Sequence, residues 1–89
     1  MITQNFTVQN RLGLHARPAA LLVQTAADFA CDIKIAKDNV EVNAKSIMGV
    51  LMLAAQHGAV LRMQFDGEDE KQASAAISDL FAHKFNEEF

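Results

Sequence analysis

The stretch that decides the fold is residues 32–43, DIKIAKDNVEVN. Apolar and polar side chains alternate along each half of it, which is the period of two expected for a β-strand with one buried face. Between the halves, Lys37-Asp38-Asn39 predicts a tight turn, because Asp and Asn tolerate the left-handed conformations that such turns require. The stretch therefore predicts a β-hairpin near the middle of the chain. Its inward-facing residues are predicted to be Ile33, Ile35, Val40 and Val42.

Strands and helices are predicted on both sides of this hairpin. Alternation predicts strands over residues 2–8 and 61–66. Helical spacing of apolar residues predicts one helix after the loop around Gly13, a second over residues 47–56 and a third after the acidic residues 68–70. Ser46 is a favoured N-cap for the second helix, and Gly58 is a stop signal beyond its end. The apolar stripes are Ala19, Leu22, Val23 and Ala26 in the first helix, and Ala73, Ala76, Ile77, Leu80 and Phe81 in the last.

The resulting order, β-α-β-β-α-β-α, is typical of an α+β fold. It predicts a four-stranded, mainly antiparallel sheet that three helices cover on one face, since each element has only one apolar side to bury. Eighty-nine residues is short for more than one domain, so residues 1–89 are expected to form a single domain. The uncovered sheet face is predicted to carry Thr3, Thr7, Lys34, Glu41 and Arg62.

Composition and charge argue against several classes of function. Eight basic and eleven acidic residues give a net charge of −3, which disfavours nucleic acid as a partner. The apolar run over residues 47–55 is far shorter than the roughly 20 residues of a membrane-spanning helix, and the N-terminus does not resemble a secretory signal. The single cysteine, Cys31, cannot form an internal disulfide. We therefore expect a cytoplasmic protein with no membrane insertion.

The stretch GLHARPAA, residues 13–20, places a histidine and an arginine at the mouth of the first helix. A free imidazole has a pKa of about 6.5, so most such side chains are neutral at pH 7 and keep a nucleophilic lone pair. The first amides of a helix attract anions, and the guanidinium of Arg17 offers a planar fork of donors that suits phosphate. Pro18 fits a first helical turn, where its missing N–H costs nothing. The spacing indicates a nucleophile, His15, beside a phosphate-sized site.

Other chemistry is missing from the sequence. There is no Ser/His/Asp or Cys/His set, no glycine-rich phosphate loop, no nearby pair of carboxylates and no metal-ligand spacing. We therefore expect no metal and no cofactor, and a phosphoryl carrier with a phosphohistidine intermediate in place of a stand-alone enzyme. The alternative interpretation is that His15 and Arg17 serve only as ordinary capping and surface charge.

Three motifs, GLHARPAA, KSIMGVLMLAA from Lys45 and GEDEKQA before the last helix, resemble HPr, the histidine-containing phosphocarrier family of the bacterial phosphotransferase system. The likeness covers nearly the whole chain. It implies an open-faced β-sandwich with three helices on one side. It also implies that His15 takes a phosphoryl group on Nδ1 from phosphorylated enzyme I and passes it to a IIA-type protein, while Arg17 holds the phosphoryl oxygens.

The resemblance also suggests partner-binding and regulatory residues. A docking patch for enzyme I and acceptors would contain Ala16, Ala20, Ile47, Met48 and Leu51, although these residues could instead complete a small core. Ser46 aligns with a serine that a dedicated kinase modifies in some bacteria, with a phosphatase to reverse it. The alternative is that Ser46 is present simply as an N-cap.

Other functions remain open at this point. One is a regulatory docking module, controlled by Ser46 phosphorylation, that binds transcriptional regulators or enzymes. Another is an unrelated small α/β domain that binds a ligand or carries a metal. Within the carrier interpretation, sugar uptake and nitrogen-type or carbon regulation are both open, and a monomer is expected. His57 and His83 are explained as cations near helix ends, Cys31 as a core filler, and residues 86–89 are expected to fray.

Overall fold

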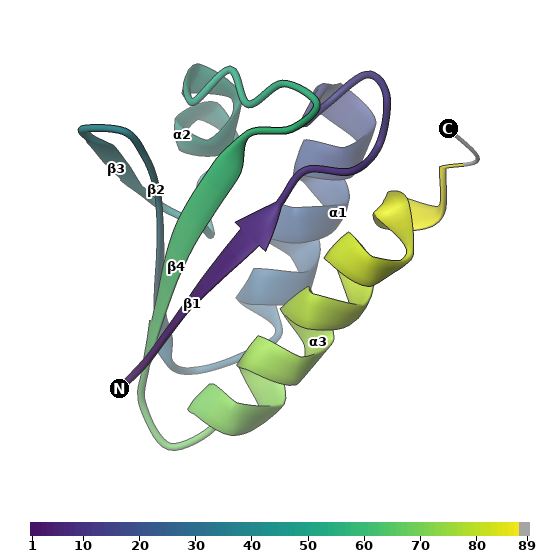
Figure 1. The fold of residues 1–89 in the computed structure, drawn as a ribbon. Helices are drawn as coiled ribbons and strands as arrows, with labels where there is room; N and C mark the ends of the chain where they lie inside the picture. The colour runs from purple at the N-terminus through teal and green to yellow at the C-terminus, as the bar shows by residue number, and fades with distance from the viewer. Residues whose placement is uncertain (88–89) are drawn as a thin grey trace.

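The structure, a computed structural model, describes residues 1–87. Over these residues the elements follow the predicted order β-α-β-β-α-β-α, with a short 3-10 turn added after the last helix (Figure 1). No helix within this part of the chain is both long and apolar enough to cross a membrane. The elements are β1 (Ile2–Thr7), α1 (Ala16–Ala27), β2 (Asp32–Lys37), β3 (Val40–Asn43), α2 (Ile47–Met52), β4 (Val60–Asp66), α3 (Glu70–Ala82) and η1 (Lys84–Asn86).

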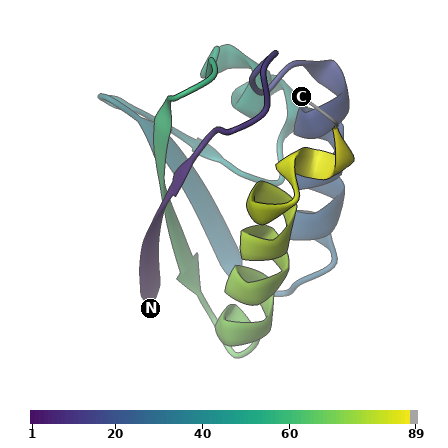
Figure 2. The same cartoon turned by 45° about the vertical axis from the view of Figure 1, so that its right-hand side comes forward.

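The strands form one antiparallel sheet in the order β1-β4-β2-β3. Helices α1 and α3 lie side by side against one face, and α2 lies at the end of the sheet (Figures 1 and 2). The opposite face is exposed, and on it Lys34 Nζ lies 3.9 Å from Glu41 Oε1. The predicted α+β fold with one open sheet face is therefore confirmed. The five residues predicted to be wet are all exposed: Thr3, Thr7, Lys34, Glu41 and Arg62.

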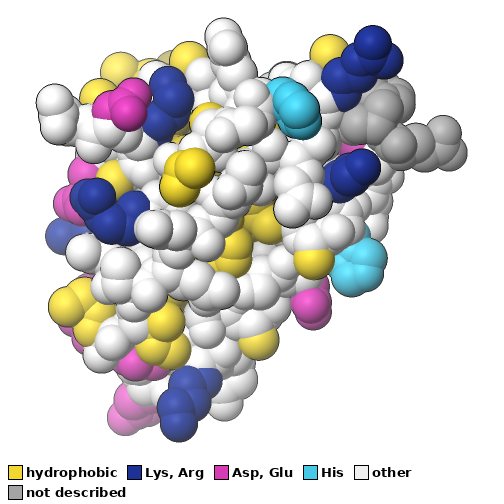
Figure 3. Space-filling model, viewed as in Figure 1, with side chains coloured by type: hydrophobic (Ala, Val, Ile, Leu, Met, Phe, Trp, Pro, Cys, Tyr) yellow, Lys and Arg dark blue, Asp and Glu magenta, His cyan; other side chains and the backbone are white. Residues whose placement is uncertain are grey.

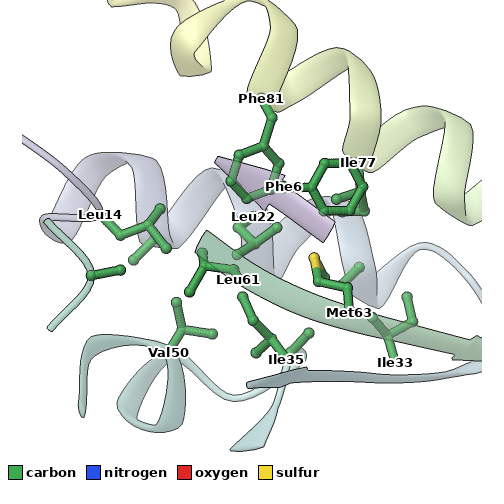
Figure 4. Packing of buried hydrophobic residues seen from close by; sticks show 14 of the residues in the cluster. Phe6, Leu14, Leu22, Ile33, Ile35, Val50, Leu61, Met63, Ile77 and Phe81 are labelled. Carbon is green, nitrogen blue, oxygen red and sulfur yellow. The ribbon is translucent and has the colours of Figure 1, made fainter. Parts of the chain in front are cut away.

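The core fills the space between the sheet and the two long helices (Figure 4). Phe6 of β1 stacks on Phe81 of α3 with ring centroids 4.7 Å apart, and Phe81 meets Phe85 edge to face at 4.9 Å. The strand residues contribute from alternate positions, as their period of two requires. The residues that are fully or almost fully buried include Leu22, Ile33, Ile35, Val50, Leu61, Met63, Phe65 and Ile77.

Two local predictions are wrong. Helix α2 ends at Met52 and not near Gln56, because Ala54 adopts a left-handed φ of 49° and the chain leaves the helix there. Val40 is 50% exposed although it was predicted to face inward. It pairs with Lys37 next to the turn of the hairpin, at the tip of the edge strand.

The segment after α2 supports the loop that precedes α1. The amide of Leu14 donates to the carbonyl of Ala55 at 2.9 Å, and the amide of Gly58 donates to Val8 at 2.8 Å. Gly13 has a φ of +71°, and a Cβ built there would lie 2.5 Å from the Ala55 carbonyl oxygen. Only glycine fits this close approach without displacing backbone. The loop that carries His15 is thus fixed by the chain that follows α2.

Candidate functional site

His15 occupies the N-cap position of α1. Its backbone is extended, with φ −77° and ψ −170°, and its carbonyl accepts the first helical hydrogen bond from Ala19 at 3.0 Å. The imidazole does not cap the helix and instead projects outward, with 36% of the side chain exposed. Pro18 is buried in the first turn, as its missing N–H allows. The predicted placement of His15 at the helix mouth is therefore found in the structure.

The N-terminus of α1 provides a positive environment next to the ring. The amides of Ala16 and Arg17 come before the first intrahelical donor, so the helix itself offers them no acceptor. The first turn contains no acidic residue that would cancel the positive end of the helix dipole. Figure 3 shows Lys, Arg and His side chains at the upper right of the view, among mostly uncharged surface. An anion beside His15 would therefore meet these free amides and the guanidinium of Arg17.

Arg17 shares a carboxylate oxygen with His15. Arg17 Nη1 donates to the carbonyl oxygen of Phe85 at 2.9 Å and lies 3.6 Å from Glu87 Oε2. The same Glu87 oxygen lies 2.9 Å from His15 Nε2. The structure thus brings the two predicted residues together, and it adds Glu87 as their common partner.

Asn10 is the fourth residue of this arrangement. Its side chain is fully buried, and Nδ2 donates to the Gly13 carbonyl at 2.6 Å and to Glu87 Oε1 at 2.8 Å. Asn10 Oδ1 has no hydrogen-bond partner among residues 1–87. Asn10 therefore joins the loop before His15 to the carboxylate that faces the ring.

Sequence reasoning missed Asn10 and Glu87, and it expected residues 86–89 to fray. Asn86 ends η1, and Glu87 is held by the contacts above, so the expectation is wrong for both; Glu88 and Phe89 lie outside the described residues. Glu87 is 72 residues from His15 in the chain, so no local pattern could connect them. The one signal available was Asn10, a polar residue two positions beyond the apolar end of the first strand pattern.

The residues proposed for docking lie on α1 and α2. Ile47, Met48 and Leu51 are 39%, 67% and 37% exposed, while Ala16 is exposed and Ala20 is half-buried. On α2 only Val50 is buried, so most apolar side chains of this short helix face solvent and do not complete the core. Exposed apolar side chains grouped in this way are typical of surfaces that bind other proteins.

Ser46 is the N-cap of α2, as predicted. Its Oγ accepts a hydrogen bond from the amide of Gly49 at 3.2 Å. Gly49 lies close to β3, where an added Cβ would be 3.1 Å from Val42 Cβ. The capping role of Ser46 is thus visible in the geometry, and a regulatory role would be additional to it.

The remaining candidate side chains have structural surroundings. Cys31 is buried, and burial together with the nearby Asp69 carboxylate raises the pKa of its thiol. His83 Nδ1 lies 2.8 Å from the carbonyl of Asp79 one turn earlier, and His57 is exposed after α2. Residues 1–87 contain no group of three metal-ligating side chains.

Comparison with known proteins connects this site to a family. The family described as "PTS HPr component phosphorylation site" matches residues 2–83. The chain is 51% identical over 88 residues to the phosphocarrier protein HPr of Xylella fastidiosa strain Temecula1, which covers 99% of both proteins. The crystal structure of HPr-C-His from Thermoanaerobacter tengcongensis has a TM-score of 0.96 and 47% identity, with 100% of both chains covered. An HPr dimer from the same organism has a TM-score of 0.79 and 47% identity, covering 98% of this chain and 100% of that one.

Proposed function

Because this chain belongs to the HPr family of phosphocarrier proteins of the phosphotransferase system, we propose that it carries the phosphoryl group on His15. The observation that supports this assignment is the exposed imidazole at the N-terminus of α1, beside the guanidinium of Arg17. His15 Nδ1 has no hydrogen-bond partner among the described residues, while Nε2 faces Glu87. The open nitrogen is thus Nδ1.

The transfer needs only a nucleophile and a site for negative charge. The lone pair of His15 Nδ1 attacks phosphorus, and the bond between phosphorus and the donor atom breaks. The phosphoryl oxygens then lie near the first amides of α1, and Arg17, whose side chain is 53% exposed, turns toward them by giving up its hydrogen bond to the Phe85 carbonyl. In the second step the acceptor attacks phosphorus, and the P–N electron pair returns to Nδ1.

The donor and acceptor are proposed from the family resemblance. Phosphorylated enzyme I would supply the group, and a IIA-type protein would receive it in the cytoplasm. Both would dock on the exposed apolar residues Ile47, Met48 and Leu51 together with Ala16 and Ala20 around His15. We propose that residues 1–89 act as one domain and as a monomer, since the docking surface is then open to each partner.

Ser46 gives this surface a means of regulation. A phosphate on Ser46 would add nearly two negative charges beside Ile47 and Met48, yet it would still suit the N-terminus of α2. A serine kinase could therefore weaken partner binding without unfolding the helix, and a phosphatase could restore it. A module that only docks to regulators is the second candidate function, and the exposed α2 residues favour it independently of His15.

Phosphoryl labelling tests the main proposal. Incubation with phosphoenolpyruvate and enzyme I should add one acid-labile phosphoryl group, and His15→Ala should abolish it. His57→Ala is the matched control, because His57 is exposed but lies after α2, and it should label normally. Labelling that survives in His15→Ala would overturn the assignment. Adding candidate IIA proteins one at a time would then separate sugar uptake from regulatory signalling.

A further inference from the structure

The C-terminal turn holds Glu87 against His15. Residues Lys84, Phe85 and Asn86 all have positive φ values, of 52°, 54° and 62°, which form a left-handed turn after α3. Such conformations are unfavourable for residues other than glycine and persist only where the surroundings enforce them. Here Phe85 is 1% exposed in the core, and its carbonyl accepts from Arg17. The buried Phe85 ring anchors the turn. Glu87, the residue that follows the turn, is thereby directed toward His15.

The carboxylate of Glu87 is surrounded by donors. It is only 9% exposed, with Oε1 accepting from Asn10 Nδ2 at 2.8 Å and Oε2 lying 2.9 Å from His15 Nε2. Arg17 Nη1 lies 3.6 Å from the same Oε2. An ionised carboxylate can only accept hydrogen bonds, so His15 Nε2 must carry the proton in this pair. In the neutral imidazole the lone pair then resides on Nδ1.

We propose that Glu87 is a positioning residue for phosphoryl transfer, which fixes the His15 tautomer whose Nδ1 is nucleophilic and orients the ring. This inference rests on the proposed function of His15. Glu87 would act on His15 as the buried carboxylate of a hydrolase triad acts on the histidine of that triad. Asn10, held by the Gly13 carbonyl, positions the carboxylate in turn.

The proton balance of the transfer explains why this partner is useful. When Nδ1 bonds to phosphorus and the donor bond breaks, the ring keeps its proton on Nε2 and gains a positive charge. The Glu87 carboxylate, 2.9 Å away, stabilises that charge. When the acceptor attacks, the P–Nδ1 electron pair returns to Nδ1 and the proton is still on Nε2. No proton has to move in either direction.

Nitrogen-15 NMR of the His15 ring tests the tautomer without any phosphorylation. At about pH 8.5, where a free imidazole is neutral, the wild-type ring should be almost wholly in the Nε2–H form. Glu87→Ala should give a mixture of both tautomers, and Glu68→Ala, an exposed carboxylate elsewhere, should match the wild type. A wild-type ring without the Nε2–H form would overturn the proposal, and so would an unchanged tautomer in a folded Glu87→Ala protein.

Transfer kinetics provide the second readout. Glu87→Ala should lower kcat for transfer from phosphorylated enzyme I by about tenfold with KM unchanged, the lower end of the loss seen when the partners that orient metal-bound histidines are removed. Glu87→Gln keeps the shape and an amide oxygen acceptor, so it should fold, retain the tautomer and still transfer more slowly because the charge is gone. A wild-type kcat in Glu87→Gln would contradict the role of the Glu87 charge in stabilising the positive ring, even if Glu87→Ala fails to fold.

The two proposals can fail separately. If His15→Ala is still labelled, the proposed function fails, whereas the NMR result decides the tautomer on its own.

Discussion

Arg17 is the residue whose geometry connects the helix mouth to the C-terminal turn. Its guanidinium donates to Phe85 O and lies beside the Glu87 carboxylate, whose Oε2 is 2.9 Å from His15 Nε2. A planar fork can hold two phosphoryl oxygens at once, and an ammonium cannot. The identity of the cation should therefore matter more than its charge.

Substitution of Arg17 by lysine should slow phosphoryl transfer and leave the fold intact. Losing one charge-assisted hydrogen bond in the transition state corresponds to about a tenfold lower rate. Rapid-quench kinetics with phosphorylated enzyme I would measure it, and Arg62→Lys on the open sheet face is the control. Equal rates for Arg17→Lys and wild type would show that the guanidinium does not bind the phosphoryl group.

At Ser46, aspartate mimics part of a phosphate while keeping a good N-cap. Ser46→Asp should weaken binding to enzyme I by adding negative charge beside Ile47 and Met48, with little change in melting temperature. Isothermal titration at two salt concentrations would measure the effect, which should shrink as salt rises. Ser74→Asp on α3 is the control, and an unchanged affinity for Ser46→Asp would count against electrostatic regulation.

Among the elements, the start of α3 is tied to the connection between α1 and β2 by one carboxylate. Asp69 Oδ2 accepts from the amide of Ala30 at 2.8 Å, and Oδ1 accepts from the amide of Cys31 at 2.9 Å. The Ala30 amide is the main cause of the lowered pKa of Asp69, and the hydrogen bond from Cys31 acts in the same direction. Asp69 is the N-cap residue by position, but its side chain bonds to this connection and does not cap its own helix.

This tie makes stability depend on pH in the acid range. The folded-state pKa of Asp69 lies below its ordinary value of 3.8. The contribution of Asp69 to the free energy of unfolding is therefore fully present above pH 3.8, and it is lost as the pH falls through the folded-state pKa. Glu70, whose pKa is lowered mainly by the Gly67 amide, contributes with the same sign. Asp69→Asn should therefore lower the free energy of unfolding at about pH 7. In this variant the free energy of unfolding should also decrease less as the pH is lowered below about 4.

Urea unfolding of Asp69→Asn and wild type between pH 2 and pH 7 would measure this difference. Asp79→Asn is a suitable control, because Asp79 is exposed on the same helix. Parallel curves for Asp69→Asn and wild type would mean that the bonds to Ala30 and Cys31 contribute nothing to the pH dependence.

Element order and the buried faces were predictable from sequence, because each depends on a short-range period. The stripes of α1 and α3 and the turn at Asp38-Asn39 follow directly from spacing and turn chemistry. The end of α2 was not predictable in this way. Apolar residues continue past Met52, but they belong to the segment whose Ala55 carbonyl contacts Gly13 and Leu14. This is a tertiary contact, which local spacing does not reveal.

For the whole molecule, the sequence predicted half of the candidate site. His15 and Arg17 are two residues apart at a helix start, so local chemistry identified both. Glu87 and Asn10 join them only because the sheet and α3 fold back to place the C-terminal turn over α1. A single sequence carries no periodic signal for a contact over that separation, and the positive φ values of residues 84–86 arise from the burial of Phe85.

The placement of His15 and the exposed side of α2 around one end of the sheet has a kinetic consequence. Under the proposed function, donor and acceptor would bind the same residues, so they could not bind the carrier at the same time. The relay must then follow a double-displacement scheme in which the phosphoryl donor dissociates before the acceptor binds. Tighter binding to either one would then reduce throughput, and modest affinity is the better compromise.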